Sequence, residues 1–175
     1  MEFRWCARTF LAVALANAGC KRAEPAAGLP APVAEVGHLN QAQLKLPVVK
    51  LWLGAQELQT EVARTPTQQA TGMMFRTEMA ENEAMLFVFA APHRASFYMK
   101  NTLIPLTCAY IDSEGVILEI HDMKPKDETA IEAGTDQVQY VLETKQGWFA
   151  RHNVSTGTVV RTERGSLAQS FFAKR

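Results

Sequence analysis

A run of five consecutive apolar residues is the first constraint on how this chain can fold. Met85-Leu86-Phe87-Val88-Phe89 has no polar position and is followed closely by Pro92. An apolar run of this length beside a turn signal predicts a β-strand that is buried on both of its faces. A strand of this kind lies inside a sheet and needs a covering layer on each side. The chain must therefore build a layered β structure around residues 85–89.

Further short segments have strand-like patterns and are separated by turn residues. The segment at 112–115 ends in Gly115, where a hairpin turn needs a positive φ angle. Short strands at close spacing are typical of a sandwich or a small barrel. We therefore predict a mainly β fold, a compact β-sandwich or small barrel of about seven to eight short strands with one or two short helices. The predicted strands besides 85–89 are 48–53, 58–63, 95–100, 108–111, 116–120, 138–142 and 158–160.

The predicted helices are both short. Thr65 can cap a helix that has Pro66 in its first position, and Gln68 completes a capping box. Gly72 ends this helix. The segment 145–152 is predicted to be a second short helix or turn that carries Trp148 and Phe149.

The N-terminal residues have the pattern of an export signal. Arg4 and Arg8 precede a short apolar stretch at 9–16. That stretch cannot span the roughly 30 Å of a bilayer core as a helix, so we predict a signal peptide at residues 1–19. Cys20 follows Ala18-Gly19 and resembles the lipidated cysteine of bacterial lipoproteins.

Two readings of Cys20 remain open. Lipoprotein signals usually carry Leu where this chain has Asn17. The alternative to lipidation is ordinary secretory cleavage nearby, which would leave Cys20 as a free thiol. Residues 20–45, with three prolines and no apolar periodicity, are predicted to be a flexible, lipid-anchored linker. The β domain is expected at 46–163, followed by a loose C-terminal tail at 164–175.

Composition narrows the function classes. Hydrophobic residues make up 47% of the chain and charged residues 21%, which suits a globular core. Eighteen basic residues balance eighteen acidic ones, so there is no electrostatic basis for binding nucleic acid. We expect no nucleic-acid partner, and contact with a membrane only through the N-terminal lipid.

Four ordered segments resemble the domain of unknown function 192 (DUF192) family over residues 46–162. The resemblance implies a compact, mainly β, sandwich-like domain, and it implies no activity. The four segments are 71–76, 84–89, 98–106 and 140–143 with Gly147. This chain departs from the family pattern at four places. The family typically has Gly at Ala84, Trp at Tyr98, Asp at Thr107 and Gly-Asp at Gly157-Thr158.

The polar residues within or beside these segments form the candidate ligand-binding site. The cationic side chains of Arg76 and Lys100 would hold an anionic or hydroxyl-rich ligand. The Asn101 amide would orient this ligand, and Tyr98 could stack on it. The candidate residues are Arg76, Tyr98, Lys100, Asn101, Thr102 and Glu143. A purely structural alternative pairs Lys100 with Glu143, while Asn101 and Thr102 stabilise the turn before Pro105.

Metal and nucleophile chemistry is not expected. The methionines with His93, His121 and Cys108 could suggest a Cu(I) site, but no tight ligand spacing occurs and core packing explains the methionines. Cys108 lies in an apolar strand, where cysteines are mostly inert. We predict no catalytic residues, no metal and no cofactor.

Together these features predict an exported protein of the periplasm or cell envelope that acts as a binding or interaction module. Its partner is expected to be an envelope polysaccharide fragment, a small anion or another protein. The alternative is a small envelope hydrolase that uses Lys100 with Glu143 or Asn101.

Overall fold

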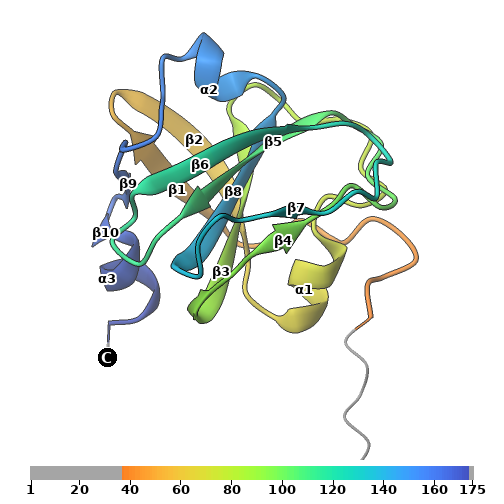
Figure 1. Cartoon of the computed structure of the whole chain (residues 1–175), viewed down its shortest axis with the longest axis horizontal. Coiled ribbons are helices and arrows are strands. Elements are labelled where there is room, and N and C mark those ends of the chain that lie inside the picture. The colour runs from red at the N-terminus through yellow and green to blue at the C-terminus, as the bar shows by residue number, and fades with distance from the viewer. Residues whose placement is uncertain (1–36, 174–175) are drawn as a thin grey trace, which may run out of the picture. The chain divides into compact units, whose positions relative to one another are not determined.

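The computed structural model describes residues 37–173. The predicted signal peptide at 1–19, Cys20 and most of the predicted linker lie outside the described residues. The described part is mainly β, as predicted, and Figure 1 shows its elements. The strands are β1 (Val48–Leu53), β2 (Gln56–Ala63), β3 (Glu83–His93), β4 (Ser96–Phe97), β5 (Leu106–Ile111), β6 (Ile117–Met123), β7 (Ile131–Glu132), β8 (Val138–Lys145), β9 (Val160–Thr162) and β10 (Gly165–Ser166).

Three short helices complete the described part: α1 (Pro66–Thr71), α2 (Trp148–Arg151) and α3 (Leu167–Phe171). None of these helices within residues 37–173 has the length and apolarity to cross a membrane.

Eight strands form one mixed sheet in the order β10-β9-β1-β2-β3-β8-β5-β6, and β4 pairs with β7 in a separate two-stranded sheet. Strands β2 and β3 are parallel, with α1 in the connection between them, and the other pairs are antiparallel. The large sheet ends at β10 and β6, so among residues 37–173 it does not form the closed barrel that was one of the two predicted forms.

The central strand β3 is buried on both faces, which confirms the prediction from its apolar run. Leu86 and Val88 pack into one hydrophobic cluster, and Met85 and Phe87 pack into another. The second cluster is covered by residues that follow α1 and by the β4–β7 pair. The strand continues through Pro92, beyond its predicted end, with an irregular register between Val88 and His93.

The hairpin turn before β6 depends on Gly115. Gly115 has a φ of 85°, and a Cβ atom there would lie 2.9 Å from the carbonyl oxygen of Val160. The Val160 N–H donates a 2.8 Å hydrogen bond to the Gly115 carbonyl. Glycine therefore lets the β5–β6 turn lie directly against β9.

Helix α1 begins and ends where the sequence predicts. Thr65 and Gln68 form the capping box, and Gly72 is the C-cap with a φ of 47°. A Cβ atom at Gly72 would lie 3.1 Å from the ring of Phe87. The end of α1 is therefore held close above β3.

Both ends of the predicted domain need correction. The expected loose tail at 164–175 contains β10 and α3, and Leu167 is fully buried in the core. The predicted linker also ends earlier than residue 45. Leu39 donates from its N–H to the Thr71 hydroxyl at 3.0 Å, and the Gln43 side chain donates to the Gly72 carbonyl at 2.8 Å.

The predicted strand at 95–100 is shorter than expected. Only Ser96 and Phe97 pair, as β4, and the chain turns at Lys100 and Asn101. Leu103, which follows this turn, is exposed. The residues from Tyr98 to Lys100 are therefore not part of a β-strand.

Candidate functional site

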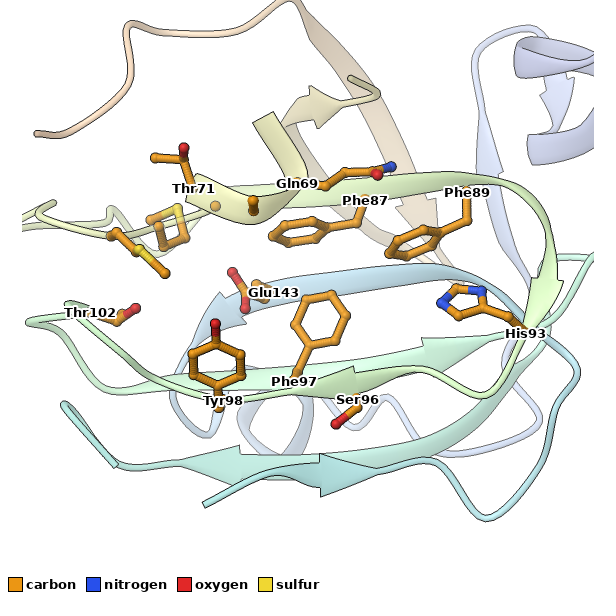
Figure 2. Close-up of a pocket in the computed structure, with 14 residues that line it drawn as sticks. Gln69, Thr71, Phe87, Phe89, His93, Ser96, Phe97, Tyr98, Thr102 and Glu143 are labelled. Atoms are coloured by element: carbon orange, nitrogen blue, oxygen red, sulfur yellow. The ribbon is translucent and has the colours of Figure 1, made fainter. Parts of the chain in front are cut away.

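A pocket of about 260 Å³ opens between the end of α1, β3, the segment at 96–102 and the middle of β8. Figure 2 shows its walls, with α1 on one side and the segment carrying Phe97 and Tyr98 on the other. The lining is a mixture of aromatic, thioether and polar side chains. The lining residues are Gln69, Ala70, Thr71, Gly72, Met73, Met74, Phe87, Phe89, His93, Ser96, Phe97, Tyr98, Thr102 and Glu143.

The side chain of Glu143 lies at the floor of this pocket. Strand β8 pairs Glu143 with Met85 on one side and Cys108 on the other, so its side chain is on the same sheet face as these two core residues. The residue is 5% exposed. Its Oε2 atom has no hydrogen-bond partner among the described residues. Burial raises the pKa of Glu143 to about 8.

A buried carboxyl group without a hydrogen-bond partner lowers the stability of a protein core. Buried polar groups are hydrogen-bonded in the large majority of cases, and leaving one without a partner destabilises the fold. With a pKa of about 8, Glu143 is mostly protonated at neutral pH. A buried carboxyl with a perturbed pKa beside a pocket marks a candidate functional site.

The pocket walls are rich in aromatic rings. Phe97 lies edge-on to Phe87 at a centroid distance of 5.0 Å and to Phe89 at 6.5 Å. His93 packs on Phe89 at 4.4 Å. Tyr98 is 45% exposed, and in Figure 2 its hydroxyl points into the space beside Glu143. The pocket thus has largely apolar walls around a single carboxyl group.

Three other polar side chains that line the pocket have hydrogen-bond partners. Gln69 donates to the Val88 carbonyl at 2.8 Å, Thr71 to the Thr67 carbonyl at 2.8 Å, and Thr102 to the Lys100 carbonyl at 3.3 Å. Glu143 differs from these residues because no such partner accounts for its buried oxygen.

The structure brings together half of the predicted site residues. Tyr98, Thr102 and Glu143 line the pocket. Arg76, Lys100 and Asn101 do not line it.

Arg76 pairs with Glu61 instead. Its guanidinium donates to the two Glu61 carboxylate oxygens at 2.6 and 2.7 Å, and the two side chains are 16% and 11% exposed. Burial by itself would raise the pKa of Glu61, but the hydrogen bonds and charge of Arg76 outweigh it and hold that pKa below its ordinary value. The pair joins the segment after α1 to β2.

The predicted pairing of Lys100 with Glu143 is not formed. Among residues 37–173 no ion pair involves Lys100, and Oε2 of Glu143 is unpartnered. Lys100 lies in the turn after β4 and does not line the pocket that contains Glu143. The side chain of Asn101 lies 3.9 Å from the Met74 sulfur. A catalytic pair of Lys100 with Glu143 is therefore not assembled in this pocket.

Sequence reasoning missed the apolar half of the site. Four apolar side chains that line the pocket were not among the candidates. Met73 and Phe87 belong to the second hydrophobic cluster, Phe97 packs against it, and Met74 is buried. The four family-like segments of the sequence could have pointed to these lining residues. Each of the four segments contributes lining residues, and the lone acidic residue in the β8 segment is the one at the floor.

Cys108 is not a nucleophile in this fold. It is fully buried beside Glu143 on the neighbouring strand, and burial raises the pKa of its thiol to about 12. A thiol with that pKa stays protonated at neutral pH, and the thiolate is the reactive form.

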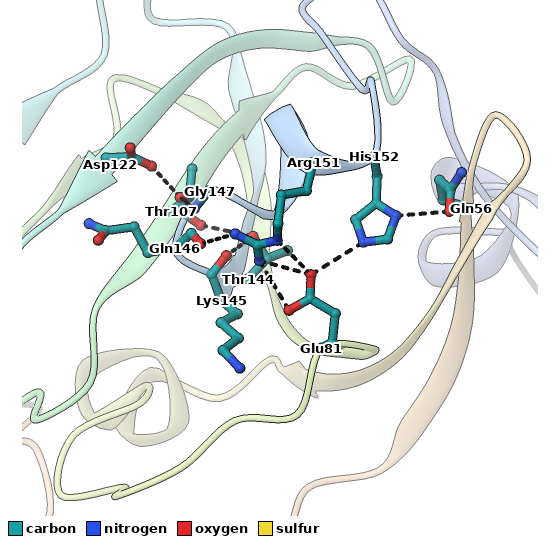
Figure 3. Close-up of polar contacts among 10 residues, drawn as sticks. All are labelled: Gln56, Glu81, Thr107, Asp122, Thr144, Lys145, Gln146, Gly147, Arg151 and His152. Atoms are coloured by element: carbon teal, nitrogen blue, oxygen red, sulfur yellow. Dashed lines mark hydrogen bonds and ion pairs between the residues drawn. The ribbon is translucent and has the colours of Figure 1, made fainter.

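A second polar cluster, drawn in Figure 3, braces the segment around α2. Arg151 donates to both carboxylate oxygens of Glu81 at 2.9 and 3.0 Å. Thr107, where the resembled family has Asp, accepts a 2.8 Å bond from the Gly147 N–H and donates to Asp122. These groups satisfy one another, so we assign this cluster a structural role.

The DUF192 family model, described as "Uncharacterized ACR", matches residues 49–162. A comparison with curated proteins gives no match.

Two solved structures are similar to this chain. One is a proposed transcription regulator from Sinorhizobium meliloti 1021, with 32% identity and a TM-score of 0.66, covering 69% of this chain and 98% of its own. The other is a protein of unknown function from Novosphingobium aromaticivorans DSM 12444, with 32% identity and a TM-score of 0.64, covering 77% of this chain and 94% of its own.

Proposed function

Because this chain belongs to the DUF192 family, whose description carries no activity, its function has to be argued from its site, and we propose that it is a small-ligand-binding module. The observation that carries the proposal is the unpartnered, buried Glu143 carboxyl at the floor of the pocket. Ligand sites typically combine apolar walls with a few convergent polar groups, one of which often has a perturbed pKa.

The walls around Glu143 fit this description. Phe87 and Phe97 provide apolar surface, and Tyr98 and Thr102 place hydroxyl groups at the pocket lining. A volume of about 260 Å³ suits a ligand of fragment size, or the end group of a larger molecule. A bound ligand would supply the hydrogen-bond partner that the protein does not give Glu143 Oε2, which offsets the destabilisation of burying it.

A fragment screen by protein-detected NMR tests the proposal. We expect fragments to shift the backbone amide signals of residues 71–74, 97–102 and 143. Ala70 lines the pocket on α1, whereas Thr67 is exposed on the same helix and does not line it. Ala70→Trp should fill the pocket and abolish these shifts, and Thr67→Trp should keep them. If no fragment shifts these signals, or if Ala70→Trp leaves the shifts intact, the proposal is wrong.

We also propose that the module is exported and anchored through a lipid on Cys20. The support is the pattern of Arg4, Arg8, the short apolar stretch at 9–16 and Ala18-Gly19 before Cys20. Labelling of cells with a fatty-acid probe should tag the natural protein and leave Cys20→Ala untagged. Equal labelling of both proteins would contradict the anchor.

A further inference from the structure

We propose that the ligand class of the Glu143 pocket is a small organic ammonium ion, with its cationic nitrogen at Glu143 and its apolar body against the aromatic wall. This inference rests on the proposed binding function and adds the chemistry of the ligand. It is the reverse of the anionic ligand that the sequence suggested through Arg76 and Lys100.

The charge of the lining supports a cation. The lining residues include one carboxyl group and neither Lys nor Arg. Arg76, one of the two cations in the predicted site, lies outside the pocket lining and is paired with Glu61. An anion in the pocket would find no Lys or Arg side chain among the lining residues to balance its charge. An ammonium group instead gives the carboxylate a charge-assisted hydrogen bond.

The walls support the same ligand. Phe87, Phe97 and Tyr98 line the pocket and have π faces, which attract cations when the cation lies over the ring. The thioethers of Met73 and Met74 are polarisable and pack against irregular apolar groups. An ammonium ion with an apolar body would therefore find favourable contacts at both of its ends.

Binding must be coupled to ionisation of Glu143. The titratable groups near Glu143 are Cys108, which pairs with it on β5, and Tyr98, whose hydroxyl points into the space beside it. His93 lines the same pocket but lies at the end of β3, where it pairs with Val138. Glu143 has a pKa of about 8, so an ammonium ligand that binds at pH 7 displaces the carboxyl proton. We expect the release of close to one proton per bound ligand, and an affinity that falls about tenfold per pH unit below pH 7.

The experiment is calorimetric titration of the purified protein with three probes of one shape: benzylamine, benzyl alcohol and benzoate. At pH 8 benzylamine should bind at least tenfold more tightly than either of the other two. Titration at pH 7 in buffers of different ionisation enthalpy measures the proton release.

Variants test whether binding depends on the Glu143 pocket or only on the overall charge of the protein. Glu143→Gln should weaken benzylamine binding at least tenfold, whereas Glu128→Gln removes an exposed carboxylate outside the lining and should change nothing. Tyr98→Ala, at an exposed position on the opposite wall, should weaken binding several-fold without affecting the core. Thermal unfolding of each variant confirms that it is folded.

The outcomes distinguish the two proposals. Preferential binding of benzylamine that depends on Glu143 supports the ammonium class. If benzyl alcohol or benzoate binds as tightly as benzylamine, the pocket binds ligands but the ammonium class is wrong. If none of the probes binds and the fragment screen also finds no ligand, both proposals are wrong.

Discussion

The N–H of Phe75 donates a 2.8 Å hydrogen bond to the carbonyl of Asn101, and both residues have positive φ angles, 63° and 55°. This bond joins the segment at 71–76 to the segment at 98–106. Each segment supplies residues to the pocket, so the bond fixes the distance between two of its walls. A bulky residue such as Phe is rare in this conformation, whereas Asn tolerates it.

The conformation at Asn101 predicts a stability effect. Asn101→Ala should destabilise the fold by about 1 kcal/mol, because an alanine side chain is unfavourable at positive φ. Asn101→Gly should be close to neutral at this position. Urea unfolding of the three proteins measures both effects. A stability for Asn101→Ala equal to that of the natural protein would show that the backbone is not held in this conformation.

The buried carboxyl predicts a pH dependence of stability. The folded pKa of Glu143, about 8, lies above its ordinary value of 4.5, so the folded state binds more protons than the unfolded state between these values. Stability therefore falls as pH rises, by about 3 kcal/mol from pH 5 to pH 8. Glu143→Gln should remove this part of the slope in denaturant unfolding at several pH values. An unchanged slope in the variant would contradict the assignment.

The Arg76–Glu61 ion pair should contribute far more to the stability of the domain than an exposed ion pair does. Arg76→Met leaves Glu61 buried without its partner and should destabilise the domain by about 3 kcal/mol. Lys50 and Glu57 form an exposed pair at 2.9 Å, so Lys50→Met should change stability by less than about 1 kcal/mol. Chemical denaturation of both variants makes the comparison. Similar losses in the two variants would contradict a special role for Arg76.

The C-terminal helix should be part of the folded unit. Leu167 is fully buried, so Leu167→Ala should destabilise the domain by about 3 kcal/mol through the lost contacts and the cavity. Ala168 is exposed on the same helix, and Ala168→Ser should have little effect. Equal stability of Leu167→Ala and the natural protein would restore the view that this segment is a loose tail.

Much of the fold could be predicted because local signals were strong. The capping box at Thr65, the apolar run at 85–89 and the glycine turn at Gly115 each specify their own conformation. The end of the domain could not be predicted in this way. The helix with Leu167 has one buried residue and five residues in all, too few for a visible periodicity, and long-range packing stabilises it.

The site was only partly predictable for a similar reason. Glu143 and Tyr98 both line the pocket, and both lie in family-like segments. The pairing of Lys100 with Glu143 does not form, because the strand ends at Phe97 and Lys100 lies in the turn that follows. Phe97 was not a candidate, because an apolar side chain in the sequence does not reveal whether it faces a filled space or a pocket.

The pKa of the Glu143 carboxyl, measured with and without an amine, tests the proposed ammonium site most directly. Carbon-detected NMR can follow its side-chain carbonyl through a pH titration, with the signal identified by its loss in Glu143→Gln. We expect a pKa of about 8 in the free protein, and a pKa lower by more than about two units with benzylamine bound. A Glu143 that titrates near the ordinary value of 4.5 in the free protein, with no response to the amine, would contradict this proposal.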